Sequence, residues 1–472
     1  VDLSLTLGVD IGLLAGGGNV LDSFFIRNAV LTGSLGLSAT DINASASLGP
    51  ATIGMTDGTA SGSIALALPI ADPGTTSSAE SAGRLDIREL LAAVTGDPFA
   101  LLGTPNIAAS AVLTGLEISF ADFLKLSGNF AVSTSPIAKV DLDTGEVLEN
   151  ARVVTYGASG ITGFAGVNEG TAQEQGFNLT VDNVAVAVIE PDDAAALRNW
   201  TAATASVSAA SFVAGDLSLI SSNLGFSINT GGGEASGGGD NDTVVDFSTI
   251  DIDGDATPEG TLSVPTGGLA PVEISYEEQF VRASGSLEVA VGDFFFANTT
   301  AVIEKQTVDV DLDGDTGNGA ELSDAELLFV GAEVSRAFAG LNGPYVLDEG
   351  SPVEGDEITN PDALGVTVDG GAFALALLSA PGGTDSRTWT GLHAEVDGLG
   401  FVGVPGLTLS GTDLLLRTNA ASGDSSGDGS GDLATALDWA NALDTDSDTN
   451  FADLLVFDPD ETPSSGDEIT LD

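Results

Sequence analysis

The chain has 472 residues, with 12 Lys and Arg against 70 Asp and Glu, which gives a formal net charge of −58. This charge excludes nucleic acids and anionic membrane surfaces as partners, because both bind basic faces. Hydrophobic residues make up 43% of the chain, enough for a core, which excludes a disordered polyanion. Cysteine is absent, so disulfides are excluded and metal ions are the expected means of fixing loops.

Residues 1–112 are predicted to form an N-terminal β region. Leu3, Leu5 and Leu7 alternate with polar or small residues, which is the period of a half-buried strand. No apolar run reaches the about 20 residues that span a bilayer, so we expect no membrane insertion.

One short helix is predicted near residues 84–96. Apolar residues there fall close to helical spacing, and Asp86 is placed to cap the start. These apolar residues are Leu85, Ile87, Leu90, Leu91 and Val94.

The rest of the chain contains an internal repeat. An Arg-x-Trp-Thr segment occurs at Trp200 and again at Trp389, and a Phe follows each Trp by 12 residues. Each copy then closes on an Asn, Asn229 or Asn419. A repeat decides the architecture before any single residue does. The predicted boundaries are 113–239 for copy one, 240–430 for copy two and 431–472 for the start of a further copy.

The repeats read as short strands separated by Gly, Asn, Asp and Ser. Val184, Val186 and Val188 alternate with Ala185 and Ala187, and residues 372–377 show the same pattern. Both kinds of side chain are apolar, which predicts strands covered on both faces. The predicted fold is all-β and elongated, a solenoid-like stack of short strands with one short helix. The alternative is a chain of β-sandwich domains.

Acidic loops are the predicted metal sites. Asp-x-Asp-x-Asp segments follow the glycine-rich break of each copy, and a third run, with Glu321 beyond it, begins like an EF-hand loop. Such carboxylates can converge on calcium, which accepts six to eight oxygen ligands. The alternative is a set of solvated acidic turns. The predicted ligands are Asp251, Asp253, Asp255, Glu259, Asp309, Asp311, Asp313, Asp315, Asp444, Asp446, Asp448, Asn450 and Asp453.

Basic residues are scarce, and two of them, Arg198 and Arg387, occur at the same position of the repeat. We predict that each repeated Arg pairs with an upstream Asp and places its guanidinium near the Trp ring. The pair is structural in the first interpretation, and a sugar-binding Arg/Trp platform in the second. The residues are Asp182, Arg198 and Trp200 in copy one, and Asp369, Arg387 and Trp389 in copy two.

These features together resemble the repeats of very large secreted bacterial surface proteins, the RTX-type and giant adhesin group. The resemblance covers residues 113–472 and rests on Ser127-Gly128, Ser284-Gly285, the Arg-x-Trp-Thr segments, Leu407–Gly411 and the acidic loops. The glycine-rich calcium nonapeptide of RTX proteins is not present. The resemblance implies export, calcium rigidification outside the cell, and a role in adhesion, matrix or surface filaments.

The predicted function is therefore an extracellular or cell-surface structural repeat protein: a filament, an adhesin, or a surface-layer or matrix component. Calcium is its predicted cofactor, and self-association into filaments or arrays its predicted partnership. We predict no enzyme, since His393 is the single histidine and only one copy has it. The alternatives are a carbohydrate-binding module that contacts surface glycans and, less favoured, a polysaccharide-active enzyme.

Overall fold

The computed structural model describes most of the chain from residue 106 onward and parts of the region before it. The described residues are 2–9, 24–48, 51–69, 85–86, 106–120, 124–343, 362–457 and 469–471, with gaps at 170, 172, 192–196, 216, 236–240, 242, 269, 315–318, 382, 408, 428, 430 and 446–449.

The regular structure of these residues is entirely β, as predicted, and 19 strands belong to one sheet. The remaining four strands form two separate pairs, β12 with β13 and β22 with β23. The bounds are β1 Asp2–Val9, β2 Phe24–Leu48, β3 Ala51–Pro69, β4 Leu85–Asp86, β5 Asn106–Phe120, β6 Leu124–Leu142, β7 Val147–Val167, β8 Gln175–Glu190, β9 Asn199–Ala214, β10 Leu217–Gly232, β11 Val245–Asp251, β12 Leu262–Val264, β13 Val272–Ile274, β14 Phe280–Val291, β15 Phe295–Val310, β16 Leu322–Leu341, β17 Leu364–Asp369, β18 Gly371–Ser379, β19 Thr388–Val402, β20 Leu409–Ser422, β21 Leu443–Asp444, β22 Leu455–Phe457 and β23 Ile469–Leu471.

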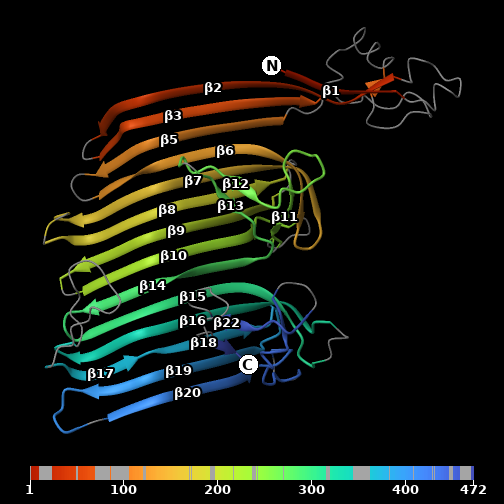
Figure 1. The fold of residues 1–472 in the computed structure, drawn as a ribbon. Coiled ribbons are helices and arrows are strands. Elements are labelled where there is room, and N and C mark those ends of the chain that lie inside the picture. Colours follow the sequence, from red (N-terminus) through yellow and green to blue (C-terminus); the bar gives the residue numbers. More distant parts are fainter. Residues whose placement is uncertain are drawn as a thin grey trace.

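The large sheet is an antiparallel meander in which long strands pair with the next long strand in the chain (Figure 1). Its spatial order is β1, β2, β3, β5 to β10, β14, β15, β16, then β17 and β18 in line, β19 and β20. The all-β prediction is confirmed. The solenoid-like stack and the chain of β-sandwiches are not confirmed by this pairing.

The helix near residues 84–96 is not found among the described residues. Leu85 and Asp86 instead form β4, which pairs with Ile26 and Phe25 of β2, because the pairing of β2 with β3 begins only at Val30 and leaves these two residues with backbone groups to pair. The rest of that prediction falls outside the described residues. No helix in the described part of the chain has the length and hydropathy needed to cross a bilayer.

Two segments lie on the sheet at one end of its long strands (Figure 1). The first covering segment, residues 241–279, contains β11, β12 and β13, and the β12–β13 pair contacts β7, β8 and β9. The second covering segment, residues 431–457 with 469–471, contains β21, β22 and β23, which contact β15, β16, β18 and β19. We call the side of the sheet beneath them the covered face.

Small side chains on the covered face allow these segments to pack closely. Ala185 and Ala187 of β8 are fully buried beneath the first segment, and residues 374 and 376 of β18, also Ala, are fully buried beneath the second. A Cβ added at Gly391 would lie 2.8 Å from the ring of Trp439. The Ala residues of the repeated alternation therefore form the surface on which a covering segment packs.

The Trp and Asn positions that both copies of the internal repeat share hold these segments in place. The Trp200 indole N–H donates to Thr243 Oγ1 at 3.1 Å, and the Asn229 amide donates to the carbonyl oxygens of Val245 and Glu278 at 3.0 and 2.9 Å. In the second copy, Trp389 donates to the Thr435 carbonyl at 2.8 Å and Asn419 to that of Leu437 at 2.7 Å. The Trp and Asn are structural anchors in both copies.

The opposite side of the sheet, which we call the open face, carries the bulky half of the alternation. Its side chains form rows across the strands, since directly paired residues point to the same side. One row runs through Val132, Tyr156, Val186, Ala203, Ile228 and Val281. No described segment covers this row, so the prediction of cover on both faces is confirmed only for the small side of these strands.

Candidate functional site

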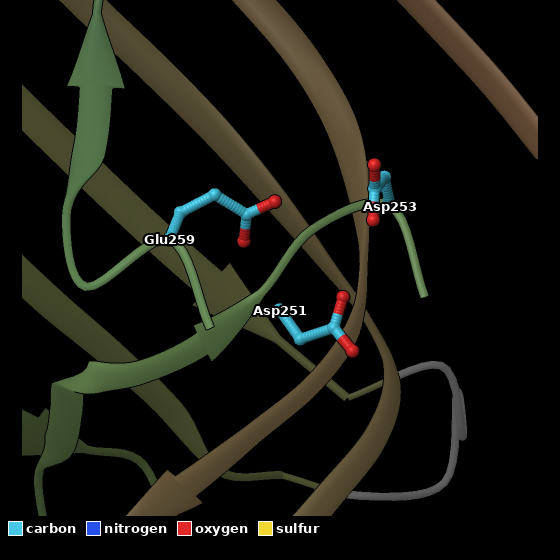
Figure 2. A group of neighbouring side chains, drawn as sticks. All are labelled: Asp251, Asp253 and Glu259. Carbon is cyan, nitrogen blue, oxygen red and sulfur yellow. The ribbon is translucent and has the colours of Figure 1, made fainter. Parts of the chain in front are cut away.

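Loop one (residues 251–259) follows β11 and gathers three acidic side chains. Carboxylate oxygens of Asp251, Asp253 and Glu259 lie within 4.8 Å of one another. Asp251 is buried, with Oδ1 accepting from the Gly254 backbone N–H at 2.7 Å and Oδ2 from that of Ala256 at 3.0 Å. Figure 2 shows Asp251 at the end of β11, Asp253 further along the loop, and Glu259 reaching back across it.

Loop two (residues 311–321) follows β15 and repeats this arrangement with Asp311, Asp313 and Glu321, again within 4.8 Å. Asp311 is 2% exposed, and its Oδ1 accepts from the backbone N–H groups of Asp313 and Gly314 at 3.1 and 2.7 Å. Its Oδ2 is buried and has no hydrogen-bond partner in the described part of the chain. A buried carboxylate oxygen without a partner is costly, and a cation bound in this loop would offset that cost.

Each loop is closed by its final Glu. The backbone N–H of Ile252 donates to Glu259 Oε2, and that of Leu312 donates to Glu321 Oε2, both at 2.8 Å. The acidic side chain is therefore held over the loop even without an ion. The backbone N–H of each closing Glu also donates to the carbonyl before the first Asp: Glu259 to Ile250 at 2.8 Å and Glu321 to Val310 at 3.0 Å.

Loop three (residues 444–453) has the same closure with a shorter acid. The backbone N–H of Thr445 donates to Asp453 Oδ2 at 2.7 Å, and that of Asp453 donates to the Leu443 carbonyl at 3.2 Å. Its first acid, Asp444, is buried. β21 pairs with β15, so loops two and three leave adjacent strands. The chain thus builds one closure geometry three times.

The electrostatics of loops one and two favour a hard cation. Carboxylates at this separation repel each other, and because two of the three acids in each loop are exposed, water screens part of that repulsion. A dication converts this repulsion into attraction and coordinates the oxygen atoms. Calcium suits an all-oxygen cage supplied by the protein better than magnesium, which keeps much of its water.

Some predicted ligands do not join these clusters. Asp309 Oδ1 accepts instead from the backbone N–H of Asp324 at 3.1 Å, because Asp324 has a left-handed backbone (φ 59°) that turns this N–H toward β15. Asp255 Oδ1 accepts from the backbone N–H of Thr257, two residues on, at 2.8 Å. Both carboxylates shape their loops through these bonds, and their roles as ligands stay a prediction. Three further predicted ligands, Asp315, Asp446 and Asp448, fall outside the described residues. Asn450 is described, at the start of the stretch that leads to Asp453.

Glu321 was not among the predicted ligands, although its carboxylate joins the cluster of loop two. The signal that could have found it is the segment Asp-Ile-Asp-Gly-Asp before Glu259, which matches Asp-Leu-Asp-Gly-Asp before Glu321. The shorter β6–β7 turn stands in the place of loop two in copy one. There the Asp143 residue is exposed overall, and its carboxylate accepts from the Val244 backbone N–H at 3.2 Å; partial desolvation raises its pKa.

The predicted Arg–Asp pairs are wrong in their acidic partners. Arg198 forms a two-pronged ion pair with Glu146, at 2.8 and 2.5 Å, rather than with Asp182. Glu146 lies in the β6–β7 turn beside the start of β9, a proximity that local sequence does not reveal. Asp182 instead accepts from the Ser206 hydroxyl at 3.4 Å. The Arg198 hydrogen bonds lower the pKa of Glu146.

The second copy makes the equivalent correction. Arg387 pairs with Asp385, with Nη2 donating to Oδ2 at 2.6 Å and Nε donating to Oδ1 at 3.0 Å, and these hydrogen bonds lower the pKa of Asp385. Asp369 instead lies near Arg336, with 3.9 Å between Asp369 Oδ1 and Arg336 Nε. The short i to i+2 separation makes Asp385 the more accessible partner for Arg387.

The predicted guanidinium–indole contacts are confirmed. The guanidinium carbon of Arg198 lies 5.3 Å from the Trp200 ring centroid, and that of Arg387 lies 5.8 Å from the Trp389 centroid. Both rings are 1% exposed. Such rings lie in the core and do not present a sugar-stacking surface, so the Arg/Trp pairs act as structural anchors.

No protein-family model, no curated protein and no solved structure matches the chain. The resemblance to giant bacterial surface proteins therefore stays a prediction.

Proposed function

We propose that the chain is a non-enzymatic extracellular structural protein whose β-sheet is rigidified by calcium. The observation that carries this proposal is loop two, where Asp311, Asp313 and Glu321 converge and the buried Oδ2 of Asp311 lacks a partner. The related closure of loops one and three supports a role that recurs along the sheet.

The loops lie where calcium can act on the whole fold. Asp251 ends β11, which pairs with β6, and Asp311 directly follows β15, which pairs with β21. β11 and β21 belong to the two covering segments. A cation in these loops would therefore fix the junction between each covering segment and the sheet, and so protect the buried Trp residues beneath.

The surface filament, adhesin or matrix role is the finer part of the proposal. Consecutive antiparallel strands extend one sheet through both repeat copies, which suits an elongated load-bearing element. The charge of −58 suits a cation-rich setting outside the cell. A glycan-binding module has less support, because Trp200 and Trp389 are buried.

The test is thermal unfolding of the purified chain in chelator, in millimolar calcium, and in monovalent salt of matched ionic strength, with electron microscopy of each sample. We expect calcium alone to raise the unfolding temperature strongly and to give stiff particles. Equal stabilisation by monovalent salt would mean charge screening and would overturn the calcium proposal. Magnesium at the same concentration separates a specific calcium site from a general divalent effect.

A further inference from the structure

The open face of the sheet exposes large apolar side chains along its whole width. Leu35, Leu37, Ile64, Tyr156 and Ile303 on this face are between 51% and 72% exposed. They come from β2, β3, β7 and β15, and the register places them in neighbouring rows. The exposed apolar side chains therefore belong to a surface that extends over several strands.

The extent of this surface exceeds what a solitary soluble protein shows. Less exposed Val and Leu side chains such as Val132, Val281 and Leu377 lie beside them, so the apolar surface spans many strands, whereas the largest patch of a typical monomer covers about 300–600 Å². A standard stable interface buries about 800 Å² per partner. The open face is thus large enough to carry a stable association by itself.

The net charge of the chain limits which partners can bind the open face. The chain carries −58, so two copies repel each other unless they meet through a surface of low net charge. Two ion pairs interrupt the apolar rows of the open face, Arg152 with Glu190 at 2.6 Å and Lys305 with Glu326 at 3.4 Å, and each pair is neutral as a unit. The acidic loops belong instead to the covering segments and to the strand ends near them.

We propose that the open face binds the open face of a second copy of this chain, to form a two-layered β-sandwich. Sheets pack face to face at about 10 Å with interdigitating side chains. The rows of side chains on two identical sheets have the same spacing, so they can interdigitate across the full width of the face. This favours a second copy of the chain over an unrelated protein. A two-fold axis lets the same surface serve both partners. This inference rests on the proposed structural role and names the contact by which copies associate.

The test measures the mass of the full chain by analytical ultracentrifugation, in calcium and in chelator, across a concentration series. The test variant is Y156E/I303E, which places two acids in the apolar rows. The matched control is L433E/L407E, because Leu433 and Leu407 are as exposed but lie in the second covering segment and in the β19–β20 connection. Circular dichroism and the calcium-induced shift in unfolding temperature verify that both variants fold.

We expect the parent chain and the control to sediment as dimers, twice 47.1 kDa. The dimer dissociation constant of the test variant should rise about 30-fold or more, because each substitution is buried twice in a symmetric interface. A monomeric parent chain at high micromolar concentration overturns the inference, as does a test variant that dimerises like the control. Binding of the parent chain to zwitterionic vesicles, lost in the test variant, would assign the face to lipid and also overturn it. Dimers without any calcium-induced stabilisation would retain the interface while rejecting the calcium proposal.

Discussion

The backbone N–H of Leu312 donates to Oε2 of Glu321, nine residues later, at 2.8 Å. This bond holds the Glu321 side chain over loop two, facing Asp311 and Asp313. The proposed ligand set is therefore organised without an ion, so little ordering entropy would oppose binding. The same bond between Ile252 and Glu259 organises loop one.

Glu321→Gln should weaken calcium binding at loop two. The amide oxygen can still accept from the Leu312 N–H, so the loop keeps its closure but loses one negative charge at the cation. We expect the calcium affinity of that site to fall about tenfold or more, since ligand charge tunes calcium affinity. Isothermal titration calorimetry of the full chain measures it. Glu277→Gln, an exposed acid outside the loops, is the matched control and should titrate like the parent.

Asp311→Asn should change stability with opposite signs in chelator and in calcium. Without calcium, the substitution removes a buried charge whose Oδ2 has no partner, and it relieves repulsion from Asp313 and Glu321. The unfolding temperature should then rise. With millimolar calcium, loss of the ligand should lower it relative to the parent. Differential scanning calorimetry in both buffers decides, and a decrease in both would assign Asp311 a purely structural role.

The repeat pattern predicted the fold class well and the covering of the sheet only in part. Ala185 and Ala187 indeed lie against another segment, because small side chains admit a second layer. Val184 and Val186 face the open side, and their apolar character gave no sign of what covers it. Apolar composition reports that a surface avoids water, and it does not report whether the partner belongs to the same chain.

Local acidic spacing predicted the clustering of side chains more accurately than it predicted long-range pairing. Asp251, Asp253 and Glu259 lie within nine residues, so a turn alone brings them together, and their carboxylate oxygens do lie within 4.8 Å of one another. The partner of Arg198 is Glu146, 52 positions away, and only the register of the sheet brings the two side chains together. Contacts set by strand order have no signature in a local window of sequence.

Arg387→Met should destabilise the second repeat at neutral pH and not in acid. Hydrogen bonds from Arg387 lower the pKa of Asp385, so this pair contributes stability above the ordinary carboxylate range, about pH 4. That contribution is lost as the pH falls through the lowered pKa of Asp385 in the folded state. The unfolding temperatures of parent and variant should therefore differ at pH 7 and converge at about pH 2. A difference that persists in acid would assign the effect to packing against Trp389 alone.

Asn229→Ala should loosen the first covering segment. The Asn229 amide is fully buried and donates to the carbonyl oxygens of Val245 and Glu278, so its removal leaves two acceptors without this donor. We expect a loss of about 2–3 kcal/mol in the free energy of unfolding, with the hydrogen exchange of residues 245–251 accelerated most. Urea unfolding and hydrogen–deuterium exchange measure the two effects. Ser227→Ala, two positions earlier on β10, is the matched control. Faster exchange spread evenly over β9 and β10 would contradict the anchoring role, because it would mean that Asn229 supports the sheet itself and not the segment that covers it.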